Sequence, residues 1–540
     1  MSAYRTTGSS WRRVMTNRVT RTPGRLAPGP TLDLLGLLGL LAVATLLRTW
    51  LLGSPELFRD EASSWLLARA DWGQIIPRSF AEPYPPLYPF ALKAVIGVLG
   101  DSPAALRALS VFAGVALVAV TWLWSRAALG RVPAVVAAGL VALSPLAIAN
   151  SRDTRMYALE ALFITLAWWL IWRLVTGEGI GSRRLASIVA ASLAIGAELW
   201  TMPTGLVALG LQAAAVGILA QRRGGAGARA AVWSLAGGAV LFLPWLPRLA
   251  DLVVHSRPFW TPRPGPQDLA ASFGGLLGSQ ALVPVAAIVA VLALVLAGIG
   301  LKAIVQSGHR DALATTVMVA GGVGLMVAWW LASLVRPAYD VRYMGPAVPP
   351  FAMAVAAGAA AMVRRFAGRR AALRGAAAGA AIALALVVWG TAQFEARLIG
   401  GPVEPAEAVV GLLAQRVSPG DLILVADARS YFPVAYLVER TSDPIAVAAP
   451  VRYWRSGLEP AYTGGDLVPS AAIVSPATRL DQLVSSPASG IWLVAIADPE
   501  GEVAQFKSIT GPSLIEVERY TVRHEAKSGV VVRFRAAPPS

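Results

Sequence analysis

The sequence contains no cysteine and only three histidines in 540 residues. The absence of cysteine excludes disulfides, thiolate metal sites and a cysteine nucleophile, and so few histidines exclude a histidine-rich metal site. Charged residues are also scarce, at 14%, whereas hydrophobic residues make up 56% and the mean hydropathy is +0.59. Because soluble domains usually carry about 25% charged residues, this composition argues against a soluble enzyme and indicates a multi-pass membrane protein.

Acidic side chains are missing from residues 1–30, which carry six arginines. The apolar run that follows, 31–52, is 22 residues long. It is longer than the roughly 7–15 residues of a signal-peptide core, and it lacks a small-residue cleavage site. We therefore interpret 1–30 as a disordered basic cytoplasmic tail and 31–52 as the first membrane span. Nucleic-acid binding by the tail is the alternative, but the preference of basic residues for the cytoplasmic side explains the charge.

Ten later apolar runs are interpreted as further spans. They are 104–125, 132–149, 156–175, 185–200, 205–220, 230–246, 281–301, 312–335, 347–363 and 371–393. One shorter run, 86–99, contains Lys93 and is typical of an interfacial or re-entrant helix. If it does not cross, the most basic short loops all fall on the same side as the amino terminus. These loops are 126–131, 173–184, 222–229, 302–310 and 364–374. The sequence thus predicts eleven spans, with the amino terminus inside and the carboxyl terminus outside.

The chain changes character after the last span. In 396–540 the apolar runs are short, and Gly, Pro and Asp separate them; the runs are 422–426, 445–449, 491–496 and 530–532. Together with helical stretches such as 406–415, they predict a small α/β domain outside the membrane. Residues 31–395 would form the membrane core, in which the outer loop 53–103 has two amphipathic pieces, 61–70 and 86–99, suited to the membrane surface.

Ionisable residues collect at the outer edge of the membrane in this topology, and such charges indicate function. A carboxylate there can take a proton from a hydroxyl, and arginine binds phosphate through a planar fork. The combination suits transfer of a group from a lipid phosphate. For any single residue, an ion pair that anchors a helix end, or snorkelling, explains the charge as well, so the hypothesis depends on the joint pattern. The residues are Asp60, Glu61, Glu82, Arg107, Arg152, Asp153, Arg155, Glu198, Asp340 and Arg342.

Most of these residues lie in motifs that resemble the GT-C glycosyltransferases, in particular the branch with protein O-mannosyltransferases and lipid A aminoarabinose transferases. The resemblance covers residues 31 to about 395, and its motifs follow in order, mostly on one predicted side of the membrane. They are FRDE at 58–61, PYPPLY at 83–88, ALRALS at 105–110, LGR at 129–131, SRDTRMYAL at 151–159, FWTP at 259–262 and VRYMGP at 341–346. No single motif is specific, but the ordered set is.

The resemblance implies inverting transfer of a sugar from a polyprenyl-phosphate donor to an acceptor outside the cytoplasm. It makes Asp60 of the acidic pair Asp60 and Glu61 the general base, and Arg342 a ligand of the donor phosphate. Arg155 and Tyr343 would assist at the phosphate. The other active-site residues that we predict are Asp153, Arg152, Arg107, Tyr84, Glu82 and Trp260, the last as a sugar-stacking side chain.

Cofactor and sugar are left open by the sequence. A divalent ion, if used, would be bound by Asp60, Glu61 and Asp153, whose oxygens suit magnesium, manganese or calcium. A lipid phosphate needs less neutralisation than a nucleotide diphosphate, so a metal is not required. The chain departs from the family at Tyr84, where relatives carry lysine or histidine, and at 200–203, where many carry a histidine. We therefore do not infer the identity of the sugar from the family. Richness in Ala, Gly and Arg hints at a GC-rich genome. Because cell envelopes of GC-rich Gram-positive bacteria use polyprenyl-phosphate mannose and arabinose, we prefer mannose and keep arabinofuranose or another pentose or hexose as the alternative.

A lipid flippase or transporter and a non-enzymatic scaffold are the alternative classes. Glu160 and Glu198, inside predicted spans, would suit a proton relay. Against a transporter, the sequence shows neither two similar halves nor an evident broken helix, and its charges cluster at the outer edge. We therefore predict a plasma-membrane enzyme whose partners are the lipid bilayer, a polyprenyl-phosphate sugar and an extracytoplasmic glycan, lipid or protein, with no nucleic acid.

Overall fold

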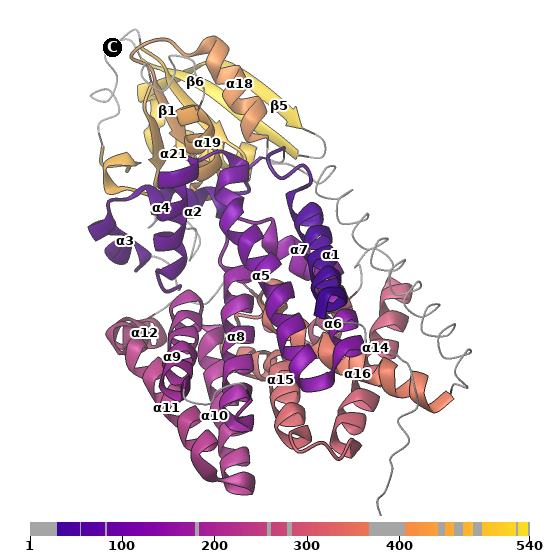
Figure 1. Ribbon diagram of the computed structural model, residues 1–540. Helices are drawn as coiled ribbons and strands as arrows, with labels where there is room; N and C mark the ends of the chain where they lie inside the picture. The colour runs from indigo at the N-terminus through magenta and orange to yellow at the C-terminus, as the bar shows by residue number, and fades with distance from the viewer. Residues whose placement is uncertain are drawn as a thin grey trace, which may run out of the picture.

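A computed structural model describes residues 30–54, 56–80, 84–178, 183–255, 261–277, 283–366, 405–440, 449–457, 468–478, 489–524 and 527–537. They form a bundle of long helices with a sheet domain stacked on one end (Figure 1). We call this end of the bundle the sheet end and the opposite end the basic end. Residues 1–29 of the predicted tail, 1–30, and the predicted last span, 371–393, lie outside the described residues.

Seven helical segments among the described residues are long and apolar enough to cross a membrane. They are α5 (Pro103–Leu129), α8 (Tyr157–Thr176), α9 (Arg184–Thr201), α10 (Thr204–Arg223), the segment Gly225–Leu252 that begins with α11 (Gly225–Phe242), α15 (Ala312–Val335) and the segment Val341–Arg365 that includes α16 (Val348–Phe366). Two further predicted spans coincide with α1 (Pro30–Thr49) and α14 (Val283–Gln306), helices of 20 and 24 residues. The predicted multi-pass helical membrane protein is confirmed.

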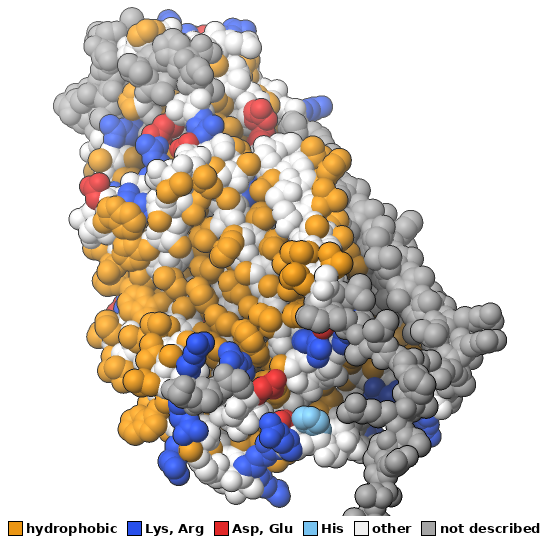
Figure 2. Space-filling view, in the orientation of Figure 1, with side chains coloured by type: hydrophobic (Ala, Val, Ile, Leu, Met, Phe, Trp, Pro, Cys, Tyr) orange, Lys and Arg blue, Asp and Glu red, His pale blue; other side chains and the backbone are white. Residues whose placement is uncertain are grey.

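The two ends of the bundle differ in charge. Arginine and lysine side chains gather at the basic end, and a broad band of hydrophobic side chains separates it from the sheet domain (Figure 2). At the basic end Asp33 pairs with Arg126 and Arg131, and Asp311 pairs with Arg223 and Arg310. These arginines belong to the short loops on which the predicted orientation rests.

One predicted span is broken. Within 132–149, α6 (Arg131–Leu143) and α7 (Pro145–Ser151) meet at an angle of 56°. Pro145 has no N–H to donate and disfavours helical geometry in the residue before it. Ser144 begins the new helix by accepting the Ala147 N–H on its hydroxyl. The expectation that no span is broken was therefore wrong. With the break counted as one bent span, eight segments meet the criteria.

A buried arginine of α1 satisfies the carbonyl groups at this break. Arg48 donates to the carbonyls of Val141 and Ala142, at 3.4 and 3.0 Å, and to Ser151 Oγ at 3.1 Å. A cation is favourable at the negative end of a helix dipole. Gly114 of α5 makes room for this contact, because a Cβ there would lie 1.9 Å from Ser151 Oγ. Arg48 thus fixes α7, and with it the loop 152–156.

The loop 53–103 folds into three short helices between the bundle and the sheet domain (Figure 1). They are α2 (Arg59–Arg69), α3 (Trp72–Ser79) and α4 (Leu87–Leu99). The first and last match the predicted amphipathic pieces, and α4, with 13 residues, is too short to cross about 30 Å of hydrocarbon. The unpredicted α3 exposes Trp72, Ile76 and, just after it, Phe80, which suits a membrane surface.

The carboxyl-terminal region is the predicted α/β domain. Its sheet has the strand order β3-β2-β1-β4-β6-β5, parallel from β3 to β4, with β6 antiparallel to β4 and to β5. The strands are β1 (Leu422–Val425), β2 (Val451–Trp454), β3 (Ile473–Val474), β4 (Ile491–Ala495), β5 (Leu514–His524) and β6 (Lys527–Ala536), and the helices are α18 (Ala406–Arg416), α19 (Ala428–Arg440) and α21 (Pro499–Thr510). The predicted strands in 422–426, 491–496 and 530–532 and the helix at 406–415 are confirmed. Residues 445–448 lie outside the described residues.

Candidate active site

Charged residues from distant segments meet at the sheet end of the bundle. The Asp60 carboxylate of α2 lies 3.4 Å from a guanidinium nitrogen of Arg342, 282 residues later. Arg155 donates to the Asp60 carbonyl at 3.3 Å, and its guanidinium lies over the Tyr84 ring, 5.4 Å from the centroid. The hydroxyls of Tyr84 and Tyr343 are 3.3 Å apart. The fold thus brings five of the sequence-predicted residues into one cluster.

Asp60 is loosely held. It is the second residue of α2, where the helix dipole favours a negative charge. Its side chain is 30% exposed, and its ion pairs with Arg59 and Arg342 measure 3.5 and 3.4 Å. Strong charge-assisted hydrogen bonds are shorter, about 2.7–2.9 Å. The carboxylate is therefore accessible and free to exchange partners.

Glu61, the next residue, is tightly bound. Arg107 donates to its two oxygens at 2.8 and 2.7 Å, and both side chains are 4% exposed. Thr154 donates its N–H and hydroxyl to the Glu61 carboxylate at 2.9 and 3.1 Å, and Phe58 donates its N–H at 3.0 Å. Arg107 also donates to the carbonyl of Leu52. This pair therefore fastens the first turn of α2 to α5 and to the loop that follows α7.

Arg342 stands on a well-anchored backbone. Its N–H donates to Asp340 Oδ1 at 2.9 Å, and its carbonyl accepts from the Asn150 side chain at 2.9 Å. The guanidinium contacts Asp340 Oδ2 at 3.3 Å and lies over the Tyr157 ring, 5.6 Å from the centroid. Because the side chain is 29% exposed, the guanidinium can meet a ligand without moving the backbone.

Arg152 and Asp153, in the loop 152–156, differ from the five residues of this cluster in the contacts that the structure describes. Arg152 donates to the carbonyls of Leu47 and Trp50 at the end of α1, at 3.1 and 2.7 Å. Asp153 has one buried carboxylate oxygen without a hydrogen-bond partner among the described residues. Burial raises the pKa of Asp153 to about 8, and the nearby Glu61 carboxylate adds to the rise. The protonated form of Asp153 is therefore favoured.

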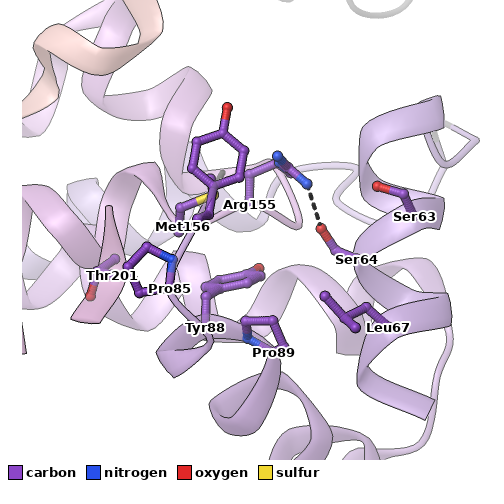
Figure 3. A pocket seen from close by; sticks show the side chains of 10 residues that line it. Ser63, Ser64, Leu67, Pro85, Tyr88, Pro89, Arg155, Met156 and Thr201 are labelled. Atoms are coloured by element: carbon purple, nitrogen blue, oxygen red, sulfur yellow. Dashed lines mark hydrogen bonds between the residues drawn. The ribbon is translucent and has the colours of Figure 1, made fainter. Parts of the chain in front are cut away.

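A small pocket opens beside the cluster (Figure 3). It is lined by Ser63, Ser64, Leu67, Tyr84, Pro85, Tyr88, Pro89, Arg155, Met156 and Thr201. Arg155 reaches across it to the Ser64 hydroxyl at 3.0 Å, and Ser63 and Ser64 both donate to the Asp60 carbonyl. Sequence reasoning missed the two serines. The helical spacing 60, 63, 64, 67 could have found them, because it places these residues on one face.

The remaining predicted residues are not part of this geometry. Glu82 and Trp260 lie outside the described residues. No group of three His, Cys, Asp or Glu side chains in the described part of the chain could bind a metal ion. Asp60, Glu61 and Asp153 therefore do not fit a metal, since the Glu61 oxygens are already occupied by Arg107 and Thr154.

Comparison with protein-family models found no match, and comparison with curated proteins found none either. Solved structures do match. ArnT from Cupriavidus metallidurans superposes with a TM-score of 0.61 in the apo state and 0.60 bound to undecaprenyl phosphate; identity is 14% and 13%, over 92% of this chain and 97% of ArnT. The archaeal oligosaccharyltransferase AglB from Archaeoglobus fulgidus, in complex with an inhibitory peptide and a dolichol-phosphate, matches with a TM-score of 0.51 and 13% identity, over 75% of this chain and 59% of AglB. Identities this low establish the fold alone, and the chain therefore has the GT-C fold that its motifs predicted.

Proposed function

We propose that this chain is a membrane glycosyltransferase that moves a sugar from a polyprenyl-phosphate donor to an acceptor hydroxyl at the sheet end. The observation that carries the proposal is the loose pair of Asp60 and Arg342, a base and a phosphate-binding cation 3.4 Å apart beside a pocket. The comparisons support it, because ArnT was solved with undecaprenyl phosphate and AglB with a dolichol-phosphate.

Asp60 is the general base in this proposal. Glu61 is paired with Arg107, and burial favours the protonated form of Asp153. Asp60 is then the accessible acid of the three, with its side chain 30% exposed. It takes the proton of the acceptor hydroxyl while that oxygen attacks the anomeric carbon from the face opposite the phosphate, with inversion. Glu61 acts as a positioning residue.

The donor phosphate is bound by Arg342, assisted by Arg155 and Tyr343. The bond between the anomeric carbon and the phosphate oxygen breaks, and the phosphate leaves with the electron pair, which the two guanidinium groups stabilise. Arg342 contacts Asp60 only at 3.4 Å, so the guanidinium can exchange this contact for the phosphate and leave the carboxylate to the acceptor hydroxyl.

A transfer assay tests this proposal. Purified protein in nanodiscs would receive radiolabelled polyprenyl-phosphate sugars, with mannose as the expected donor and arabinofuranose or another pentose or hexose as the alternatives. The acceptor class, whether glycan, lipid or protein, is tested in the same assay. Label should move with wild type and not with Asp60→Asn. Absence of transfer from every donor would contradict the proposal.

The membrane orientation follows from the charge asymmetry. We propose that the basic end faces the cytoplasm and the sheet end faces outside. Because the chain has no cysteine, Ser508→Cys in α21 and Ser307→Cys after α14 form a matched pair at exposed positions. An impermeant maleimide should label the first in intact cells and the second only after lysis. The reverse pattern would place the site in the cytoplasm.

A further inference from the structure

The sheet domain packs directly on the helix that carries Asp60. The last turns of α19 lie against α2, where the rings of Tyr436 and Trp65 meet edge to face, 5.0 Å apart at 87°. The two side chains are 2% and 1% exposed. Arg69 of α2 pairs with Glu439 of α19 and lies over the Trp65 ring. This is a packed junction rather than a loose contact between domains.

Asp101 is the common partner of both sides of the junction. Its carbonyl accepts the Tyr436 hydroxyl at 3.0 Å, and its carboxylate accepts from Arg440 at 2.6 Å and from the Trp65 indole at 3.1 Å. Asp101 directly precedes Ser102, which caps α5. One residue thus joins α2, the start of α5 and the sheet domain.

The junction and the pocket lie on different faces of α2. Positions 60, 63, 64 and 67 face the pocket and the Asp60 cluster, whereas Trp65 and Arg69 face α19. Arg107 of α5 holds the first turn of α2 through Glu61, and Asp101, just before α5, holds the middle of α2 through Trp65. The direction of α2 is thus fixed at two points, and at the second of them Asp101 also binds Tyr436 and Arg440 of the sheet domain.

We propose that the sheet domain is part of the active-site scaffold, with Tyr436 and Arg440 as positioning residues that set the Asp60–Arg342 distance through Asp101 and Trp65. This inference rests on the proposed function. Arg342 is anchored through Asn150 and Asp340, which belong to the bundle. A change at the junction therefore shifts Asp60 and leaves Arg342 in place. A misplacement of about 1 Å in reacting groups can cost roughly 10²-fold in rate.

The test is the double variant Tyr436→Phe, Arg440→Gln, which removes two hydrogen bonds to Asp101 and keeps the ring at position 436. The matched control is Arg416→Gln in α18 of the same domain, which loses its bond to the Tyr520 hydroxyl at 2.8 Å. We expect kcat to fall about 10–100-fold in the junction variant, KM for the donor to stay within about twofold, and amide hydrogen exchange to rise in 59–69. The control should match wild type, and Arg440→Lys should retain much of kcat because it keeps the charge facing Asp101.

Different outcomes contradict the inference and the proposed function. An unchanged kcat in the junction variant would overturn the inference, as would a loss of activity with general exchange throughout the sheet domain, which indicates unfolding. If wild type transfers no sugar but the junction variant still raises exchange in α2, the proposed function fails and the mechanical coupling stands. If exchange in α2 does not change, the coupling itself is wrong.

Discussion

Acidic side chains occur in two contrasting regions of this protein. At the sheet end, Asp60 and Glu61 each face an arginine supplied by another segment of the chain. Inside the spans, Glu160 of α8 and Glu198 of α9 are fully buried, and neither has a salt bridge to a basic side chain among the described residues. Both oxygens of Glu160 lack a hydrogen-bond partner there, and Glu198 accepts one bond, from Gln212 at 3.1 Å.

The contrast distinguishes carboxylates that can take part in chemistry at the membrane edge from acids buried within the spans. A carboxylate is expensive to bury in hydrocarbon without a cation, so the acids within the spans are expected to be protonated. At the sheet end, water and arginine stabilise the ionised form, so the acids there can accept protons. The difference favours an enzyme that works at the membrane edge over a transporter with a proton path through the bundle.

Asp60→Asn should produce the largest loss of transfer. The amide has the same shape but cannot accept the acceptor's proton, and loss of a general base typically costs about 10²–10⁴-fold in kcat. Folding should be intact, because the side chain is partly exposed and loosely paired. Asp71→Asn, an exposed position in the same loop, is the control. Turnover by purified Asp60→Asn protein at the wild-type rate would remove Asp60 as the base.

Arg342→Ala should have the next largest effect. Hydrogen bonds to charged groups contribute about 1.5–3 kcal/mol, so affinity for polyprenyl phosphate in nanodiscs should fall roughly 10–100-fold and turnover with it. Arg342→Lys should recover part of the affinity, because charge survives without the bidentate fork. Arg336→Ala, at an exposed position nearby, is the control. Unchanged affinity in Arg342→Ala would place the phosphate elsewhere, with Arg155 as the next candidate.

The sequence predicted both Asp60 and Arg342, but only the family resemblance, and no local pattern, distinguished Asp60 from Glu61. Apolar run lengths are sufficient to predict spans, because each span must bury its own backbone hydrogen bonds. Whether an acid is free or clamped depends on a residue such as Arg107, 46 positions away from Glu61. The break at Ser144 was missed because Arg48, which compensates it, lies in another helix. The junction of α19 with α2 joins segments more than 360 residues apart, and no local pattern encodes it.

Glu61→Gln should act mainly on stability. It leaves the buried Arg107 without its carboxylate, and breaking a buried ion pair costs about 3–5 kcal/mol. The thermal midpoint in detergent should fall clearly, with a smaller loss of kcat at temperatures where the protein stays folded. Replacing both partners, as in Glu61→Gln with Arg107→Met, should recover part of the midpoint. A kcat loss as large as that of Asp60→Asn with an unchanged midpoint would instead make Glu61 a base.

Asp153→Asn should change the pH dependence of stability. Burial raises the pKa of Asp153 to about 8, whereas an aspartate in an unfolded chain titrates near 4. Between about pH 4 and 8 the folded state binds more protons at this group, so its contribution lowers stability as pH rises and levels off above 8. Asparagine should remove this slope. Thermal midpoints at pH 5 and pH 8.5 should therefore differ less in the variant than in wild type.

Glu160→Gln and Glu198→Gln should have the smallest effects. If the buried acids are already protonated, an isosteric neutral amide changes neither charge nor packing, and at position 198 the amide oxygen can still accept the Gln212 N–H. Transfer should stay within about twofold of wild type across the pH range, with an unchanged thermal midpoint. A proton relay would behave differently, because an amide cannot exchange a proton and either substitution would interrupt the path. Loss of function in both glutamine variants, together with activity retained in Asp60→Asn, would therefore reverse the comparison and favour the transporter.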